Sequence, residues 1–264
     1  MSATTWDPAQ YLRFGSERVR PAVDLLARIP LTAPTFVIDL GCGAGNVTAM
    51  LNARWPEADI LGVDESEPML AQARQMLPDC RFEIADIAQF RPARPPDIIY
   101  SNAALHWLPD HRHLFPRLIS ALAPGGLLAV QMPAMDRAPF RTLQQEVAKS
   151  GPWAAALARI GPVQPILHPG EYWELLRPIA ASLELWETTY FQVLTGPDAV
   201  LQWAMGTSLR PYLTALDEPE RTAFRNAYAA ALRPHYPERG DGVTFFPFRR
   251  FFLVASAGAG QRPG

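Results

Sequence analysis

The sequence has few of the cysteines that hold small secreted proteins together and no segment suited to crossing a membrane. Its two cysteines, Cys42 and Cys80, can form at most one disulfide. The first residues do not have the charged and then apolar layout of a secretory signal. No uninterrupted apolar run approaches the roughly 18 residues that a membrane helix needs. We therefore expect a protein of the reducing cytoplasm that does not span a membrane.

An excess of charge of one sign is also missing. The 24 basic residues nearly balance the 26 acidic ones, which gives a formal net charge of -2. This balance argues against the large positive surface that nucleic-acid binding requires. The five histidines are not spaced as a recognisable metal site. A chain of 264 residues can bury a large core without disulfides. We expect a monomer with a small-molecule substrate and no metal.

Lysine is nearly absent, since Lys149 is the only lysine among the 24 basic residues and the others are all arginine. Codon composition is one explanation for this bias. The other is that some arginines recognise carboxylates with both arms of the planar guanidinium group, which lysine does less well. The sequence leaves both explanations open.

Between residues 35 and 132, short apolar runs alternate with amphipathic stretches, which is typical of βαβ units and a parallel sheet. Five runs are predicted strands: Thr35–Leu40, Asp59–Asp64, Arg81–Ala85, Asp97–Asn102 and Leu127–Met132. Three stretches with apolar residues at three- and four-residue spacing are predicted helices: Asn46–Arg54, Met69–Leu77 and His113–Leu122. This order predicts an open α/β sheet.

Helices and two more strands are predicted around this core. Residues 1–30 are expected to form a helical lid, with a second helix that starts at Pro21. Helical cap inserts are predicted at 136–181 and 197–240. Strands are predicted at Leu183–Val193 and Thr244–Ala255, and a disordered tail at 258–264. We expect residues 1–264 to form a single domain.

The strongest local signal is a glycine-rich turn after the first predicted strand. Asp39 precedes it, and Gly41, Gly43 and Gly45 lead into Asn46. Glycine is needed where φ is positive or a ligand approaches the backbone closely, and open α/β sheets bind ligands at such strand ends. The spacing G-x-G-x-G differs from the G-x-G-x-x-G of dinucleotide binding. The Asp39 carboxylate would repel a pyrophosphate but accept from the ammonium group of an amino-acid moiety. We predict a cofactor-binding loop.

Two further acids end the next two predicted strands. Asp64 ends the second strand, where a carboxylate accepts both hydroxyls of a ribose. Asp86 ends the third, where its side chain or the Ile87 backbone would meet an adenine edge. A helix cap or a solvated turn is the alternative for each acid. Met69 is predicted to pack on the adenine, with a core position as the alternative.

This combination resembles the class I S-adenosylmethionine-dependent methyltransferases, whose pattern is an acid, a G-x-G-x-G loop and acids that end strands two and three. The resemblance implies S-adenosylmethionine as the cofactor. It also implies a Rossmann-like, seven-stranded, mostly parallel sheet whose last strand is antiparallel. The end of the fourth strand should then face the methyl group, which makes Asn102, His106 and Trp107 candidates for the pocket. His106 has the pKa range of a base, although a histidine that holds the loop by hydrogen bonds is the alternative.

Segments outside that core resemble one family more closely, the trans-aconitate 2-methyltransferases. They are Trp6–Arg28, Leu108–Pro116, Leu122–Pro133, Leu209–Leu213 and Arg250–Ala255. This resemblance implies an O-methyltransferase that forms a methyl ester on a carboxylate of trans-aconitate or a related small polycarboxylate. It weakens between about residues 136 and 178, so the first insert is where substrate preference would differ.

A polycarboxylate acceptor requires cations and hydroxyl donors in a pocket closed from water. We predict that Tyr11, Arg18, Arg210 and Arg250 supply them, with a surface position as the alternative for each arginine. A carboxylate is already ionised at neutral pH, so no catalytic base is required. One alternative is a small-molecule O-, N- or C-methyltransferase on another metabolite with His106 as base. Two others are a nicotinamide-dependent oxidoreductase and a cofactor-binding protein without catalysis.

Overall fold

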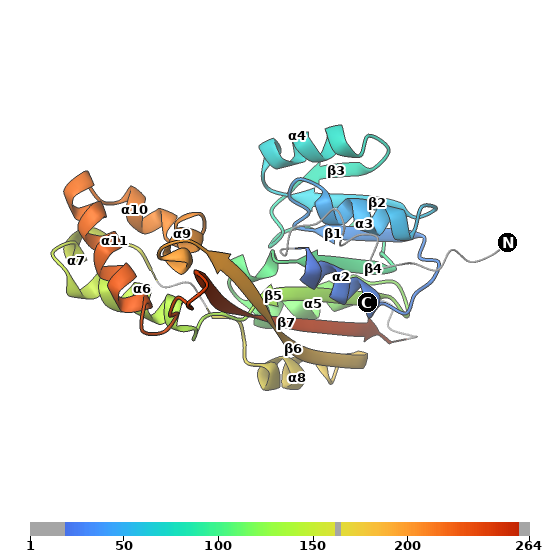
Figure 1. Ribbon diagram of the computed structural model, residues 1–264. Coiled ribbons are helices and arrows are strands. Elements are labelled where there is room, and N and C mark those ends of the chain that lie inside the picture. Colours follow the sequence, from blue (N-terminus) through green and yellow to red (C-terminus); the bar gives the residue numbers. More distant parts are fainter. Residues whose placement is uncertain (1–18, 162–164, 259–264) are drawn as a thin grey trace. The chain divides into compact units, whose positions relative to one another are not determined.

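The strands of the protein form one seven-stranded sheet. The computed structural model describes residues 19–161 and 165–258, and its strand order is β3-β2-β1-β4-β5-β7-β6 (Figure 1). The strands are β1 Phe36–Leu40, β2 Asp59–Asp64, β3 Arg81–Ile84, β4 Ile98–Asn102, β5 Leu127–Pro133, β6 Ala180–Thr195 and β7 Val243–Ala257. The first five are parallel, and β7 runs antiparallel to β5. The predicted α/β, Rossmann-like, mostly parallel sheet is confirmed.

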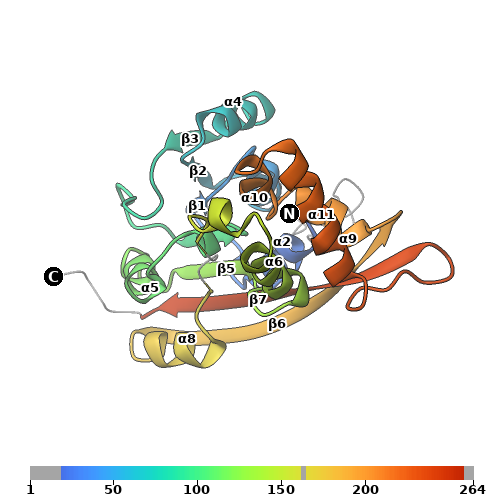
Figure 2. The ribbon, with the colours of Figure 1, turned by 90° about the vertical axis from the view of Figure 1, so that its left-hand side faces the viewer.

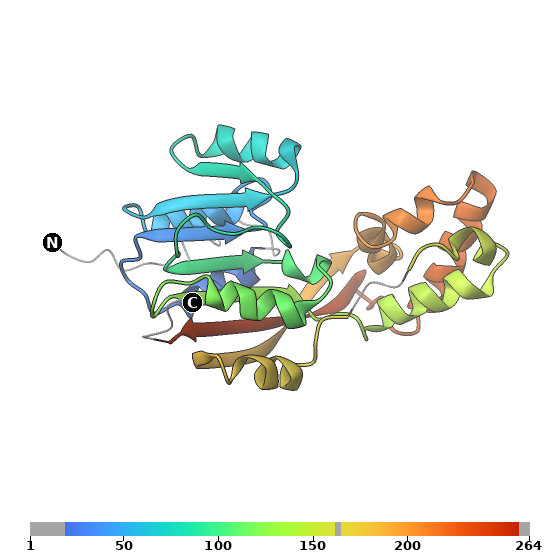
Figure 3. The same ribbon diagram turned by 180° about the vertical axis from the view of Figure 1, so that it is seen from behind.

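Helices cover both faces of the parallel strands. They are α2 Arg20–Ala27, α3 Asn46–Arg54, α4 Glu67–Met76 and α5 His111–Ser120. On one face the Tyr100 hydroxyl donates to the Ala22 carbonyl in α2 at 2.7 Å. On the other face α5 packs on β5 (Figure 3). Two helices begin two residues before their predicted starts. A proline in its first turn favours the earlier start of α4, and Asp110, at φ 58°, turns the chain directly into α5.

Residue contacts divide the chain into two compact units. The described part of the sheet unit comprises residues 19–133, 166–188 and 250–258, and that of the helical unit comprises 134–161, 165 and 189–249. Helix α8, Pro169–Leu176, packs on α5 and belongs to the sheet unit. The predicted insert 136–181 is therefore divided between the units. The assignment of residues 1–264 to a single domain stays a prediction.

The helical unit has a core of its own. It contains α6 Pro139–Ser150, α7 Ala154–Leu157, α9 Ala199–Met205, α10 Arg210–Thr214 and α11 Glu218–Leu232. Helices α6 and α11 lie side by side (Figure 2). The Tyr228 hydroxyl donates to the Phe140 carbonyl at 2.6 Å, and the Phe140 ring meets Phe246 edge to face at 5.4 Å. Such aromatic packing contributes stability beyond the burial of apolar area.

Some predicted parts fall outside the described residues. These are the first 18 residues of the predicted lid, with Tyr11 and Arg18, and the tail after residue 258. In the described part of the chain, no helix is long and apolar enough to cross a membrane.

Candidate functional site

The glycine loop joins β1 to α3 through backbone that side chains rarely adopt. Gly41, Gly43 and Gly45 have φ values of 82°, 54° and 87°. A Cβ on Gly41 would lie 2.1 Å from the Ala104 Cβ, so only glycine fits there. A Cβ on Gly43 would meet no atom within 4 Å. Gly41 is therefore needed for packing, whereas the backbone at Gly43 is open to a ligand.

Asp39 is buried in β1, just before this loop. Its side chain is 1% exposed, and its Oδ2 accepts a 2.7 Å hydrogen bond from the Thr48 hydroxyl. The pKa of Asp39 is raised to about 7, mainly by burial; the hydrogen bond from Thr48 opposes the shift, and the nearby Asp64 charge adds to it. A cation placed near this carboxyl would favour its ionised form. Asp39 thus has the properties needed to respond to an ammonium group.

Asp64 ends β2 and is held in place by backbone N–H groups. Its Oδ2 accepts from the Gly43 N–H at 2.9 Å, and its Oδ1 accepts from the Ser66 N–H at 2.9 Å. Each carboxylate oxygen has a second lone pair that remains available for a hydroxyl. The carboxylate therefore links the glycine loop to β2 and keeps acceptor capacity for a ligand.

The loop after β3 carries Asp86 and Ile87. Asp86 is exposed, and its Oδ1 accepts from the Ala88 N–H at 2.8 Å, so its side chain holds a turn, as the alternative interpretation proposed. The Arg117 guanidinium in α5 donates to the carbonyls of Ile87, Ala88 and Phe90 at 3.2, 3.0 and 2.6 Å. Sequence reasoning missed Arg117, because nothing distinguishes it from the other arginines on amphipathic helices. It fixes the backbone that is predicted to meet the adenine.

Met69 lies in the first turn of α4 and is 45% exposed. A core position, the alternative considered for it, is therefore excluded. Asn46 is the first residue of α3, directly after Gly45. Asn46 follows the carboxyl end of β1 and Met69 follows that of β2, where the glycine loop also lies. This position is compatible with their predicted contacts to a cofactor.

The chain makes a strained turn where β4 ends. Ala103 has φ 55°, and a short helical turn at Leu105–Trp107 follows. The side-chain oxygen of Asn102 is buried, and no described residue donates to it. Strained backbone and orphaned polar atoms are typical of sites that bind a ligand.

A histidine other than His106 fastens this turn. The buried His111 donates from Nε2 to the Leu105 carbonyl at 2.9 Å and accepts at Nδ1 from the Tyr172 hydroxyl at 2.5 Å. Burial lowers the pKa of His111, which agrees with a neutral ring. His106 is half-buried, with its ring centroid 4.6 Å from that of Trp107, and Trp107 is 66% exposed.

The predicted cations lie in different surroundings. Arg250 is 8% exposed in β7, in the sheet unit. Arg210 is exposed at the first residue of α10, in the helical unit. In the ranges 19–161 and 165–258, no group of three or more His, Cys, Asp or Glu side chains is arranged to hold a metal ion. Of the two predicted cations that the structure describes, Arg250 is buried and Arg210 is exposed, so Arg250 has the burial expected of an anion-binding group.

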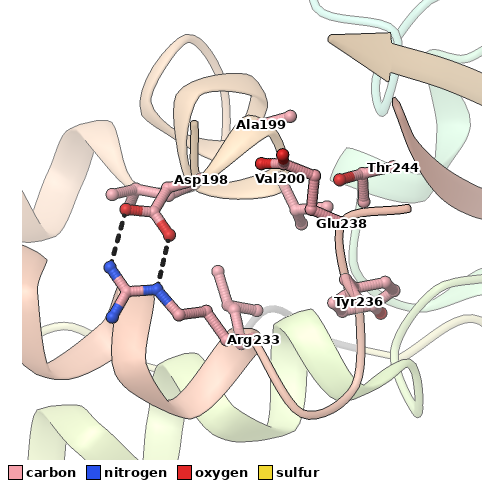
Figure 4. Close-up of a pocket in the computed structure, with 9 residues that line it drawn as sticks. Asp198, Ala199, Val200, Arg233, Tyr236, Glu238 and Thr244 are labelled. Carbon is pink, nitrogen blue, oxygen red and sulfur yellow. Dashed lines mark hydrogen bonds and ion pairs between the residues drawn. The ribbon is translucent and has the colours of Figure 1, made fainter. Parts of the chain in front are cut away.

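A cavity of about 210 Å³ in the helical unit is distinct from these residues (Figure 4). Its charged lining includes Asp198, Arg233 and Glu238. The Asp198 carboxylate accepts two 2.9 Å hydrogen bonds from Arg233, so the positive charge is already neutralised. With a further acid in the lining, this cavity is unsuited to a polycarboxylate, and no residue predicted for the site lines it.

Comparisons with known proteins agree with the geometry of the sheet unit. Residues 37–126 match the family described as "Methyltransferase domain". The chain is 49% identical over 251 residues to a trans-aconitate 2-methyltransferase of Azoarcus sp. (strain BH72), covering 95% of this chain and 98% of that one. It is 47% identical over 253 residues to a trans-aconitate 2-methyltransferase of Yersinia pestis (strain Pestoides F), covering 96% and 98%.

The fold is also similar to that of solved methyltransferases. A Haemonchus contortus phospholethanolamine N-methyltransferase 2, solved with S-adenosylhomocysteine, matches with a TM-score of 0.56 and 16% identity. The match covers 90% of this chain and 53% of that one. At such low identity the likeness concerns the fold alone.

Proposed function

Because the chain belongs to the trans-aconitate 2-methyltransferase family, we propose that it methylates a carboxylate of trans-aconitate or a related small polycarboxylate. The cofactor is S-adenosylmethionine, as in the class I methyltransferase fold that the chain adopts. The observation that carries the proposal is the combination of an open glycine loop after β1 with the buried Arg250 in β7 of the same sheet, where Arg250 pairs with Pro133 at the carboxyl end of β5. The nicotinamide-dependent alternative has no support from these relatives.

The residues of the sheet unit fit the cofactor. The open face of Gly43 leaves room for it, and the orphaned oxygen of Asn102 offers an acceptor for one of its donors. We propose that Asp39 faces the ammonium group, that Asp64 accepts from the ribose hydroxyls, and that the Ile87 backbone meets the adenine. Met69 would pack on the adenine ring, and Asp86 would keep the Ile87 turn in place.

When bound, S-adenosylmethionine supplies a methyl group on a positively charged sulfur, so that forming the O–CH3 bond breaks the S–CH3 bond and leaves a neutral thioether. An ionised carboxylate attacks without losing a proton, and the chain then needs no general base. Its task is to hold the carboxylate in line and to exclude water, which accounts for a large rate gain. We propose that Arg250 anchors the acceptor, with His106 and Trp107 at its pocket and Tyr11, Arg18 and Arg210 as further contacts.

A mass-spectrometric methylation assay tests this function. The purified protein is incubated with S-adenosylmethionine and, separately, with trans-aconitate, other di- and tricarboxylates, and their neutral amide analogues. We expect a mono-methyl ester from trans-aconitate and no product from the amides. Methylation of the amides, or of a hydroxyl or amine acceptor in preference, would refute the carboxylate proposal.

A variant of His106 separates the two methyltransferase hypotheses. If the acceptor is a carboxylate, His106→Ala should keep most of the turnover number, because no proton has to be removed. If another metabolite is methylated with His106 as base, turnover should fall by about 100-fold or more. Turnover measured at saturating acceptor distinguishes these outcomes.

The finer assignments are proposals as well. We propose that the protein acts as a monomer in the cytoplasm and does not bind nucleic acid. The thiols of Cys42 and Cys80 are free, which agrees with a reducing compartment. Size-exclusion chromatography with light scattering tests the monomer, and a band shift on added nucleic acid would contradict the last point.

A further inference from the structure

Gln131 is a buried polar side chain in the sheet unit. It lies near the end of β5 and is 0% exposed. Both its Oε1 and its Nε2 are buried, and the described residues provide no hydrogen-bond partner for either atom. An amide closed from water without partners is costly, and such groups in a folded protein call for an explanation. A leucine or methionine would fill this place in an apolar strand without that cost.

The sheet register places Gln131 with other polar residues on one face. Gln131 is opposite Asn102 of β4 and Phe252 of β7. Neighbours across strands point to the same face, as do residues two apart along a strand. Arg250 is two residues from Phe252, and Tyr100 is two residues from Asn102. Asn102, Gln131 and Arg250 therefore share the face on which the Tyr100 hydroxyl reaches α2.

The backbone of Gln131 is hydrogen-bonded to the turn that follows β4. Its carbonyl accepts a 2.9 Å hydrogen bond from the N–H of Ala103, the strained residue that follows β4. The amide is thus anchored to the turn that is predicted to face the methyl group. Because strands β4 and β7 flank Gln131 on both sides, its backbone is held in the sheet and only its side chain is free to rotate.

The strand order separates this amide from the cofactor residues. The glycine loop, Asp64 and the Asp86 loop follow β1, β2 and β3, which lie on one side of β4. Strand β5 lies on the other side of β4, next to β7 and Arg250. A ligand held by β1–β3 at one end and reaching β4 at the other would leave the end of β5 to the second reactant.

We propose that Gln131 is a specificity-determining residue that donates from its Nε2 to a carboxylate of the acceptor, beside Arg250. The inference rests on the proposed function and extends it to a residue that was not predicted from the sequence as part of the site. The neutral amide donates to one carboxylate oxygen while its Oε1 accepts from water or from the Asn102 amide group. Such an arrangement favours an anionic carboxylate over an ester or an apolar group.

Two isosteric variants test the proposal, with acceptor KM, kcat, S-adenosylhomocysteine affinity and Tm measured for each. Gln131→Met keeps the volume without the amide, and Gln131→Glu adds a charge that repels a carboxylate. For Gln131→Met we expect acceptor KM to rise about ten- to a hundredfold, the usual effect of losing a hydrogen bond to a charged group. Cofactor affinity should stay within about twofold and Tm should not fall, because an unpaired amide has been removed. Gln131→Glu should raise KM further.

Ser101→Ala is the matched control. Ser101 is equally buried in β4 but points to the opposite face, where its hydroxyl donates to the Leu40 carbonyl at 2.7 Å. This variant should lower Tm and leave acceptor KM unchanged. An unchanged KM in Gln131→Met, or a loss of cofactor affinity instead of acceptor affinity, would overturn the proposal. The wild-type assay with trans-aconitate reports separately on the proposed function, so the two can fail independently.

Discussion

Arginine side chains bind main-chain carbonyl groups at several points of this protein. Arg54 donates to the carbonyls of Leu26 and Ile29 at the end of α2, and Arg117 donates to three carbonyls in the loop after β3. Arg221 does the same for Leu213 and Leu216. A guanidinium group reaches two or three carbonyls at once in fixed directions, which an ammonium group does not. The excess of arginine over lysine therefore has a structural use besides the two explanations that the sequence suggests.

Asp39 should make cofactor binding depend on pH. With a pKa of about 7, it is mostly protonated at pH 6 and mostly ionised at pH 8. If the ionised form binds the ammonium group, the affinity for S-adenosylhomocysteine should rise about tenfold between these pH values. Isothermal titration at pH 6, 7 and 8 measures this, and at pH 6 proton release should accompany binding.

Asp39→Asn is the control for that experiment. Its affinity should be lower at pH 8 and nearly independent of pH. A raised pKa in the folded state means that burial of Asp39 destabilises the fold as pH rises from about 4 to about 7. The variant should therefore match the wild-type Tm near pH 4 and exceed it at pH 8. A flat wild-type binding profile would contradict the proposed role.

At the scale of the element, the glycine loop combines a packing requirement with a binding surface. Gly41→Ala should destabilise the protein by more than about 2 kcal/mol, since its Cβ would overlap Ala104. Gly43→Ala should cost only the roughly 1 kcal/mol of a side chain at positive φ. It should nevertheless weaken S-adenosylhomocysteine binding at least about tenfold, because its Cβ would point into the open space that is proposed for the cofactor.

Gly125→Ala is the matched control for backbone strain. Gly125 also has a positive φ, 76°, and a Cβ there would meet no atom within 4 Å, but it lies before β5 rather than in the loop. The variant should lose about 1 kcal/mol of stability and no cofactor affinity. Urea unfolding and isothermal titration measure both quantities. Equal affinities of the Gly43 and Gly125 variants would show that the loop does not contact the cofactor.

The elements differ in how well the sequence predicts them. The strands β1 to β5 begin and end within one residue of their predicted bounds. Four of them are short, mainly apolar runs, and β3 alternates polar and apolar residues in Arg-Phe-Glu-Ile. Strands β6 and β7 are longer than predicted, because small residues such as Ala and Ser, which carry little strand signal, continue both strands beyond the aromatic and β-branched stretches. Gln131 was missed because it stands inside an apolar run, where a single polar residue carries no periodic signal. Its importance depends on register, which only the folded sheet shows.

At the scale of the whole molecule, the proposed cofactor residues that the structure describes all belong to the sheet unit. Hydrogen–deuterium exchange with S-adenosylhomocysteine should therefore slow exchange at residues 41–46, 64–69, 86–90 and 102–107. The cores of α6 and α11 should exchange as in the free protein, because their hydrogen bonds lie within the helical unit. Protection confined to α6 and α11 would place the cofactor elsewhere.

The path of the chain between the two units limits how the helical unit could be exchanged between related enzymes. The helical unit consists of two separate segments, and the chain returns from the second one inside β7, between Arg249 and Arg250. Recombination that exchanged the helical unit would have to replace both segments together and rejoin one of them in register, next to a proposed acceptor-binding arginine. A single crossover cannot do this without interrupting β7, which lies between β5 and β6. New acceptor preferences in this lineage are therefore expected to arise through point substitutions rather than through domain shuffling.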